Sequence, residues 1–565
     1  MGYTGPMRRS IQALLLLRAA LWPCAAVGAD RLLVGGVVHL PNGSKPLTIA
    51  IEGGRISALL PPGEEGGQRG DRTEVVDLGG AHVLPGWIDS HLHLTGYGAS
   101  LEQVDLTGAS SWEVVVERAL AAAARLPADA WLEGRGWDQN LWADPILPDH
   151  RLLDRRLPGR PVLLRRVDGH AAVASGAALR LAGIDRDAGD PPGGRIGRRA
   201  DGEPSGLLLD TAVELVRGVM PPPSREDVER RILRAAQALL DYGLTQVHDA
   251  GTGSLELEVL RRLAAERRLP IRVYALLDGD DPGLVERELA RGPDRQMWAM
   301  LRVGGVKLYA DGALGSRGAL LGADYADDPG NRGIEVRSVA ELGRIARRAS
   351  ESGFQLAVHA IGDEAVHRTL NVFEGLGPHV CRRLRHRVEH SQVVRASDAL
   401  RFSRLGVVAS VQPTHCTSDM PWAPQRLGAR RISWAYRWRS LLDAEALLAG
   451  GSDAPVEDPD PRRGLHAAVT RQRPDGTPRE GWTPSERLTI AEALRLFTLD
   501  GAHASFSDGW CGVIRRGNAA DLTVVDVNPL EVDPERLLHL KVLRTIVAGV
   551  DRHLARAADD PGESR

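Results

Sequence analysis

Short hydrophobic runs alternate with amphipathic segments through most of the middle of the chain. The hydrophobic runs predict strands at 243–249, 303–309, 355–359, 387–390, 407–412 and 446–453. The segment after Ser224 predicts a helix, because Asp227 completes a capping box three residues later. Apolar residues recur on one face of this helix at Val228, Ile232, Leu233 and Ala236. So many alternating strands and helices predict an α/β fold with a (β/α)8 TIM-like barrel.

The two ends of the chain show a different pattern, that of short strands separated by turns. Strands are predicted at 32–34, 48–51, 55–59, 517–526 and 542–547. We therefore predict one small β-sandwich domain built from both chain ends, residues 30–84 and 512–555, beside a barrel at 85–511. A stretch rich in proline, glycine and arginine at about 100–220 is less regular, and we expect it to be an insertion after the first barrel strand.

The first residues are typical of a secretory signal peptide. Arg8 and Arg9 precede an apolar run at 11–22, and mostly small residues follow up to Ala29. This order predicts a signal peptide at 1–29 and a periplasmic or secreted protein. Arg18 interrupts the apolar run, so a cytoplasmic location is the alternative. Later segments are too short or too polar to predict a membrane span.

Composition narrows the function classes. A chain of 565 residues exceeds what one core supports, so two or three domains are expected. The net charge is −3 and basic residues are interspersed with acidic ones, which argues against a nucleic-acid partner. The four cysteines show no CxxC spacing, which argues against a cysteine zinc site. These features favour a small-molecule substrate and leave room for a homo-oligomer.

The stretch Pro85-Gly86-Trp87-Ile88-Asp89-Ser90-His91-Leu92-His93 carries the strongest chemical signal. It predicts a short strand that ends in two histidines, and residues i and i+2 of a strand point to the same side. His91 and His93 can therefore share a metal ion, although such pairs also occur on solvated strands. In a parallel barrel, polar residues at strand C-termini line the active site. Further candidates stand at the ends of other predicted strands, namely Lys307, His359, His390 and Asp453. Imidazoles with a carboxylate suit zinc or a similar divalent ion.

Lys307 has separate support from composition. Lysine and arginine together number 71, yet the lysines are only Lys45, Lys307 and Lys541. A chain that uses arginine for positive charge keeps lysine where arginine cannot serve, because a buried lysine can lose its proton and become a nucleophile. The alternative for Lys307 is a local ion pair.

The ordered motifs resemble those of the amidohydrolase superfamily of metal-dependent hydrolases, and more narrowly its YtcJ-like, amidohydrolase-3 branch. The resemblance covers roughly residues 31 to 550. It rests on the stretch 85–93 and on the segments 306–317, 359–363, 389–392, 411–415 and 451–455. Two pieces of the predicted insertion, 134–138 and 168–172, are also similar to the family.

The resemblance implies a role for each candidate ligand. His91, His93 and Asp453 would hold one metal, and His359 and His390 a second. Lys307 would take up carbon dioxide as a carbamate that bridges the two ions, although a one-metal site stays open. Asp453 would also be catalytic, accepting a proton from the metal-activated water and passing it to the leaving nitrogen. The implied activity is hydrolysis of a non-peptide carbon–nitrogen bond of amide or N-acyl type.

Alternatives remain at the level of reaction and of substrate contacts. The same activated hydroxide serves deaminases and carbamate or ester hydrolases, and a non-catalytic regulatory protein could use the same fold. The complete set of ligand positions disfavours a regulatory protein. Candidate substrate contacts are His170, Asp311, Arg317 and His415, with a structural ion pair as an equal alternative for Arg317. His248 and Asp249 also end a predicted strand, but a structural role is favoured for them.

Overall fold

The computed structural model describes residues 28–127, 129–139, 142–144, 146–166, 171–191 and 194–555. The predicted signal peptide therefore lies outside the described residues, except for Gly28 and Ala29. His170 also lies outside them.

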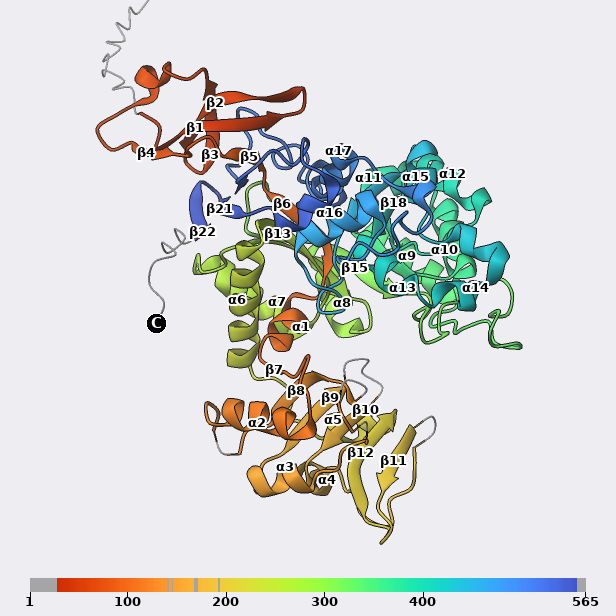
Figure 1. The fold of residues 1–565 in the computed structure, drawn as a ribbon. Helices are drawn as coiled ribbons and strands as arrows, with labels where there is room; N and C mark the ends of the chain where they lie inside the picture. Colours follow the sequence, from red (N-terminus) through yellow and green to blue (C-terminus); the bar gives the residue numbers. More distant parts are fainter. Residues whose placement is uncertain are drawn as a thin grey trace, which may run out of the picture.

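Eight parallel strands form the sheet at the centre of the molecule, in the order β6-β13-β14-β15-β16-β17-β18-β19 (Figure 1). Their bounds are β6 Trp87–Leu92, β13 Leu244–Thr252, β14 Arg272–Asp278, β15 Leu301–Tyr309, β16 Gln355–Ala360, β17 Arg387–His390, β18 Val408–Val411 and β19 Leu447–Gly450. The backbone nitrogen of Asp453 donates to the oxygen of His91 at 2.6 Å, and that of His93 donates to the oxygen of Ala454 at 2.8 Å. These bonds join the first strand to the segment after the last, and the predicted barrel is confirmed.

Strand β14 is an element that the sequence pattern did not reveal. It begins with Arg272, whose guanidinium is almost fully buried and bonds the Asp521 carboxylate, Nε to Oδ2, at 2.6 Å. A charged residue at the start of a short apolar run argues against a buried strand. The carboxylate that pairs with this residue lies far along the chain, so the local pattern does not predict the strand.

Helices follow the barrel strands and cover them from outside. They are α1 Leu94–Ser100, α6 Arg225–Asp241, α7 Ser254–Ala265, α8 Pro282–Arg291, α9 Val339–Glu351, α10 Asp363–Leu376, α11 Pro378–Leu384, α12 Ala396–Leu405, α13 Pro413–Asp419, α14 Ala423–Arg431, α15 Trp438–Asp443, α16 Pro461–Thr470, α17 Ile490–Leu496 and α18 Leu499–Ala504. Helix α6 shows why they pack there, because Val228, Ile232 and Ala236 are fully buried on its inner face. Among the described residues, no helix is both long and apolar enough to cross a membrane.

The predicted capping box begins helix α6. Ser224 accepts a bond from the backbone of Asp227, whose side chain accepts one from the backbone of Ser224 in return. Ser224→Ala should lower the free energy of unfolding by about 1 kcal/mol, because a helix-end donor loses its partner. Chemical unfolding of this variant beside Ser110→Ala, an exposed serine that caps no helix, measures the effect. Equal stability of the two variants would contradict the predicted contribution.

Strands from both ends of the chain form a second sheet, in the order β22-β21-β20-β5-β1-β2-β3, with β4 paired to β1 (Figure 1). Their bounds are β1 Arg31–Leu40, β2 Gly43–Glu52, β3 Arg55–Leu60, β4 Glu74–Asp77, β5 His82–Pro85, β20 Leu522–Val525, β21 Val542–Val547 and β22 Val550–Leu554. The antiparallel pair of β5 and β20 connects the N-terminal strands to the C-terminal ones. Residues at the two ends of the chain thus share one apolar core, which includes Leu33, Ile49 and Leu522.

Residues between β6 and β13 form a third sheet, the orange and yellow part of Figure 1. Its strands are β7 Val104–Asp105, β8 Leu132–Trp137, β9 Val162–Arg166, β10 Ala171–Ala174, β11 Gly194–Arg198 and β12 Pro204–Asp210. The helices packed on it are α2 Trp112–Ala123, α3 Arg151–Arg156, α4 Gly176–Leu181 and α5 Ala212–Arg217. The irregular sequence thus folds around cores of its own, and one of them holds Trp137 and Trp142.

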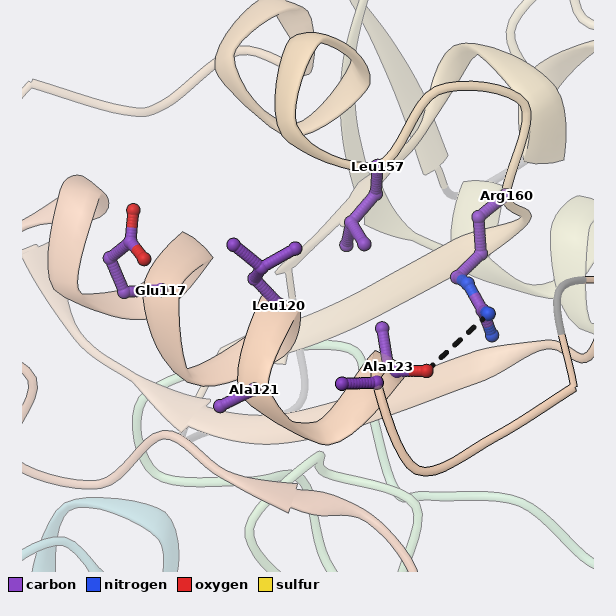
Figure 2. Close-up of a pocket in the computed structure, with 7 residues that line it drawn as sticks. Glu117, Leu120, Ala121, Ala123, Leu157 and Arg160 are labelled. Carbon is purple, nitrogen blue, oxygen red and sulfur yellow. Dashed lines mark hydrogen bonds between the residues drawn. The ribbon is translucent and has the colours of Figure 1, made fainter.

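A cavity of about 420 Å³ lies on the surface of this inserted part. Figure 2 shows Glu117 and Arg160 at opposite ends of its lining, with Leu120, Ala123 and Leu157 between them. The lining contains none of the predicted metal ligands, so this cavity is separate from the predicted active site.

Candidate metal centre

The predicted metal ligands gather at the C-terminal ends of the barrel strands. His91 belongs to β6 and His93 follows it, Lys307 lies in β15, and His359 lies in β16. His390 ends β17, and Asp453 follows β19. In the parallel register, Tyr309 lies opposite His359 and Ala360 lies opposite His390. The common direction of the strands therefore brings these side chains to one end of the barrel.

Asp453 lies against the two histidines of the first strand. Its Oδ1 is 3.2 Å from Nε2 of His93 and 3.5 Å from Nε2 of His91. One ligand atom from each of these three residues lies within 4.8 Å of the others. Burial alone would raise the pKa of Asp453, but the hydrogen bond with His93 and the neighbouring imidazoles outweigh it and hold the pKa well below its ordinary value. The carboxylate therefore stays ionised and able to bind a cation.

Two more histidines stand beside this group. The ring centroid of His390 is 4.9 Å from that of His91 and 4.5 Å from that of His359. Nδ1 of His390 donates to Oε1 of Gln412 at 2.8 Å, which leaves Nε2 free for a ligand. Nε2 of His359 is buried without a hydrogen-bond partner. A buried nitrogen of this kind is costly unless something binds it, so the donor set fits a divalent metal.

Lys307 is fully enclosed among these groups. Its Nζ is 3.2 Å from Nε2 of His91 and 4.9 Å from the ring centroid of Tyr309. Burial lowers the pKa of the Lys307 amine, while the carboxylates of Glu389 and Asp453 oppose the change without reversing it. The amine is therefore easier to deprotonate than an exposed lysine.

The site includes a buried ion pair that the sequence analysis did not single out. Arg387 and Glu389 are both inaccessible to solvent, and Nη2 of Arg387 donates to Oε2 of Glu389 at 3.0 Å. The same carboxylate oxygen contacts Nδ1 of His91. Burial alone would raise the pKa of Glu389, but Arg387 and His91 outweigh it and hold the pKa well below its ordinary value. Such a partner sets the tautomer of a histidine and directs its other nitrogen toward a metal.

The backbone turns His390 into the site. Glu389 and His390 are consecutive, so simple strand alternation would send their side chains to opposite faces. His390 has a φ of 72° and Ser391 a φ of 44°, which ends the alternation at this point. Asp453 also has a positive φ, of 61°. Non-glycine residues adopt this region at a cost, and such strain is concentrated at functional sites.

The predicted substrate contacts lie in different surroundings. Asp311 is buried and accepts bonds from three backbone nitrogens, those of Leu320, Ile361 and Gly362. Its Oδ1 is also 3.5 Å from Nε2 of His359. Arg317 pairs with Asp327, Nη2 to Oδ2, at 2.9 Å and is one-third exposed, so the structure gives it an ion pair.

His415 lies inside the cluster, where it is 7% exposed. Its Nε2 is 3.7 Å from Oδ2 of Asp453. His248 has a structural environment instead, because its Nδ1 is 3.0 Å from Nη1 of Arg387. Asp249 accepts bonds from Leu94 and Thr252.

A model of the amidohydrolase family matches residues 74–551. The chain belongs to the amidohydrolase family. This amidohydrolase is 37% identical to the protein YtcJ of Bacillus subtilis strain 168 over 484 residues, which cover 84% of the chain and 90% of the relative. It is 29% identical over 521 residues to an N-substituted formamide deformylase of Arthrobacter pascens, covering 89% and 94%. The fold matches that of a metal-dependent hydrolase from Pyrococcus horikoshii OT3, with a TM-score of 0.74, 31% identity and coverage of 89% and 99%. The predicted family is thus confirmed.

Proposed function

We propose that this amidohydrolase is a metal-dependent hydrolase that cleaves a non-peptide carbon–nitrogen bond in an amide or N-acyl compound. The observation that carries the proposal is the buried group of imidazoles around Asp453 and Lys307 at the C-terminal end of the barrel. The similarity to an N-substituted formamide deformylase supports an amide carbonyl as the target. Zinc is the proposed ion, because imidazole nitrogens together with a carboxylate oxygen suit it.

The predicted ligands would divide between one or two ions. His91, His93 and Asp453 would hold the first, while His359 and His390 would contribute to a second. A divalent ion bound there would make a water molecule more acidic and polarise the scissile carbonyl. The side chain of His93 is about one-third exposed, so this edge of the group is open to an incoming substrate.

Lys307 would join the ligand set after reacting with carbon dioxide. The neutral amine attacks the carbon of carbon dioxide, a nitrogen–carbon bond forms, and one carbon–oxygen π pair moves onto oxygen. The nitrogen then loses a proton to solvent, which leaves a carbamate with one negative charge. Burial favours the neutral amine that begins this reaction.

Asp453 would carry the proton during hydrolysis. Its low pKa keeps the carboxylate ionised, which leaves an oxygen that could accept a proton from the attacking water. The protonated carboxyl would then donate that proton to the leaving nitrogen as the carbon–nitrogen bond breaks. Asp453→Asn should lower kcat by at least about 100-fold, within the range that positioned acid–base groups supply.

Metal removal and a substrate panel test the proposal. Purified protein would be assayed against N-substituted formamides, other N-acyl amines, carbamates, esters and aminoheterocycles, before and after chelation. We expect turnover of at least one amide, loss of that turnover on chelation, and recovery with zinc and bicarbonate. Activity that survives removal of all bound metal would refute the mechanism. Turnover confined to esters or aminoheterocycles would refute the proposed bond type.

A further inference from the structure

We propose that His415 is a metal ligand, which joins His390 and Asp453 in holding the second divalent cation of the centre, such as zinc or cobalt. This inference rests on the proposed function and assigns a ligand for the same centre.

The distances within this triad suit one small cation. One ligand atom from each of His390, His415 and Asp453 lies within 4.8 Å of the others, and none of the three residues is more than 7% exposed. Nε2 of His415 is 3.7 Å from Oδ2 of Asp453. Atoms bound tetrahedrally about 2.1 Å from zinc lie roughly 3.4 Å apart, so this pair of atoms is already near the separation that a shared ion requires. His93 faces the other oxygen, Oδ1, so the two groups do not compete for one atom.

A glutamine lies at Nδ1 of each imidazole of the triad. Nδ1 of His390 bonds Oε1 of Gln412 at 2.8 Å, and Nδ1 of His415 lies 3.2 Å from Nε2 of Gln392. The ring planes are 15° apart with centroids separated by 6.0 Å. Each ring is therefore held at Nδ1. Nε2 of His390 is left to bind an ion, and Nε2 of His415 becomes available once Gln392 presents its oxygen to Nδ1.

A bound cation would explain the unpartnered imidazole nitrogen of His415. Nε2 of His415 and Oε1 of Gln392 are both buried without a hydrogen-bond partner. A half-turn of the Gln392 carboxamide would let Oε1 accept the Nδ1 proton of His415. The lone pair of Nε2 would then be free for a cation beside Asp453. A cation held by the triad would thus satisfy Nε2 of His415, which is otherwise costly to bury.

Titration of metal-free full-length protein with Co²⁺ and Zn²⁺, in competition with a chelator, tests the assignment. His415→Gln should weaken one binding event by more than about 100-fold, the upper end of the loss caused by removing an outer partner. Gln392→Leu should weaken it by about 10- to 100-fold, because the imidazole stays but loses its anchor. His466→Gln is the matched control, since His466 is 2% exposed on α16 and lies outside the triad. It should bind both ions as the wild type does.

The outcomes separate this inference from the function on which it rests. Equal metal number and affinity in wild type and His415→Gln would overturn the ligand assignment, even if KM or kcat changed. Wild type that binds no divalent ion would overturn the proposed function itself. If His415→Gln does not fold, anomalous scattering from cobalt in wild-type crystals decides. A peak among His390, His415 and Asp453 supports the site, and its absence from cobalt-loaded crystals overturns it.

Discussion

Lys307→Arg should reduce kcat by at least about 100-fold and lower the metal content of the purified protein. Arginine keeps the positive charge but does not lose its proton, so it cannot react with carbon dioxide. The larger guanidinium would also stand beside Nε2 of His91, where wild-type Nζ lies at 3.2 Å. Turnover with added zinc and bicarbonate, metal analysis and the carbamate carbon signal from labelled bicarbonate measure the effect.

Lys541→Arg is the matched control for this substitution. Lys541 is exposed and lies outside the barrel strands, so its replacement should leave turnover, metal content and the carbamate signal unchanged. Wild-type metal content and turnover in Lys307→Arg would show that the carbamate is not required. Lys307 would then have the ion-pair role that is its alternative.

Arg387→Met should lower the free energy of unfolding by about 3–5 kcal/mol, because the Glu389 carboxylate would remain buried without its partner. Arg387 also bonds the backbone oxygen of Ser90 at 2.6 Å and Oγ of Ser410 at 2.9 Å, so its loss leaves further polar atoms unpaired. Unfolding in urea measures the change. Arg217→Met serves as the exposed control, since Arg217 pairs with Glu214 at 3.0 Å on the surface. This substitution should lower the free energy of unfolding by less than about 1 kcal/mol.

The double variant Arg387→Met with Glu389→Leu separates stability from positioning. Removing both charges should restore most of the stability, because no buried charge is left alone. Metal affinity should nevertheless fall by about 10- to 100-fold, since Nδ1 of His91 loses its carboxylate partner. Wild-type metal affinity in this stable double variant would show that the ion pair supports only the fold.

Much of the fold could be predicted from local sequence patterns. The capping box at Ser224 and Asp227 and the strands that carry His359 and His390 depend on near neighbours, and all of them form. Strand β14 was not predicted, because the buried charge of Arg272 is balanced by Asp521, which lies far away in the sequence. The inserted part likewise folds around a sheet of its own despite an irregular pattern.

The residue types that form most of the site could be predicted from the sequence, but some of its members and contacts could not. The histidines, Lys307 and Asp453 were recognised as residues at strand ends, and the structure brings them to one end of the barrel. Glu389 carried a weak signal, because its i, i+2 spacing from Arg387 places both on one face of a strand. The contact between His415 and Asp453 could not be predicted from the sequence, because these residues follow different strands.

The family, the alternation of strands and helices and the choice of ligand residues were thus determined by the chain itself, because each depends on residue type and short-range order. The tertiary structure decided which of those residues meet. It joined His91 to Asp453 by closing the barrel, turned His390 inward through a positive φ, and paired Arg317 with Asp327. These outcomes depend on backbone direction and on contacts between distant strands, which local sequence does not specify.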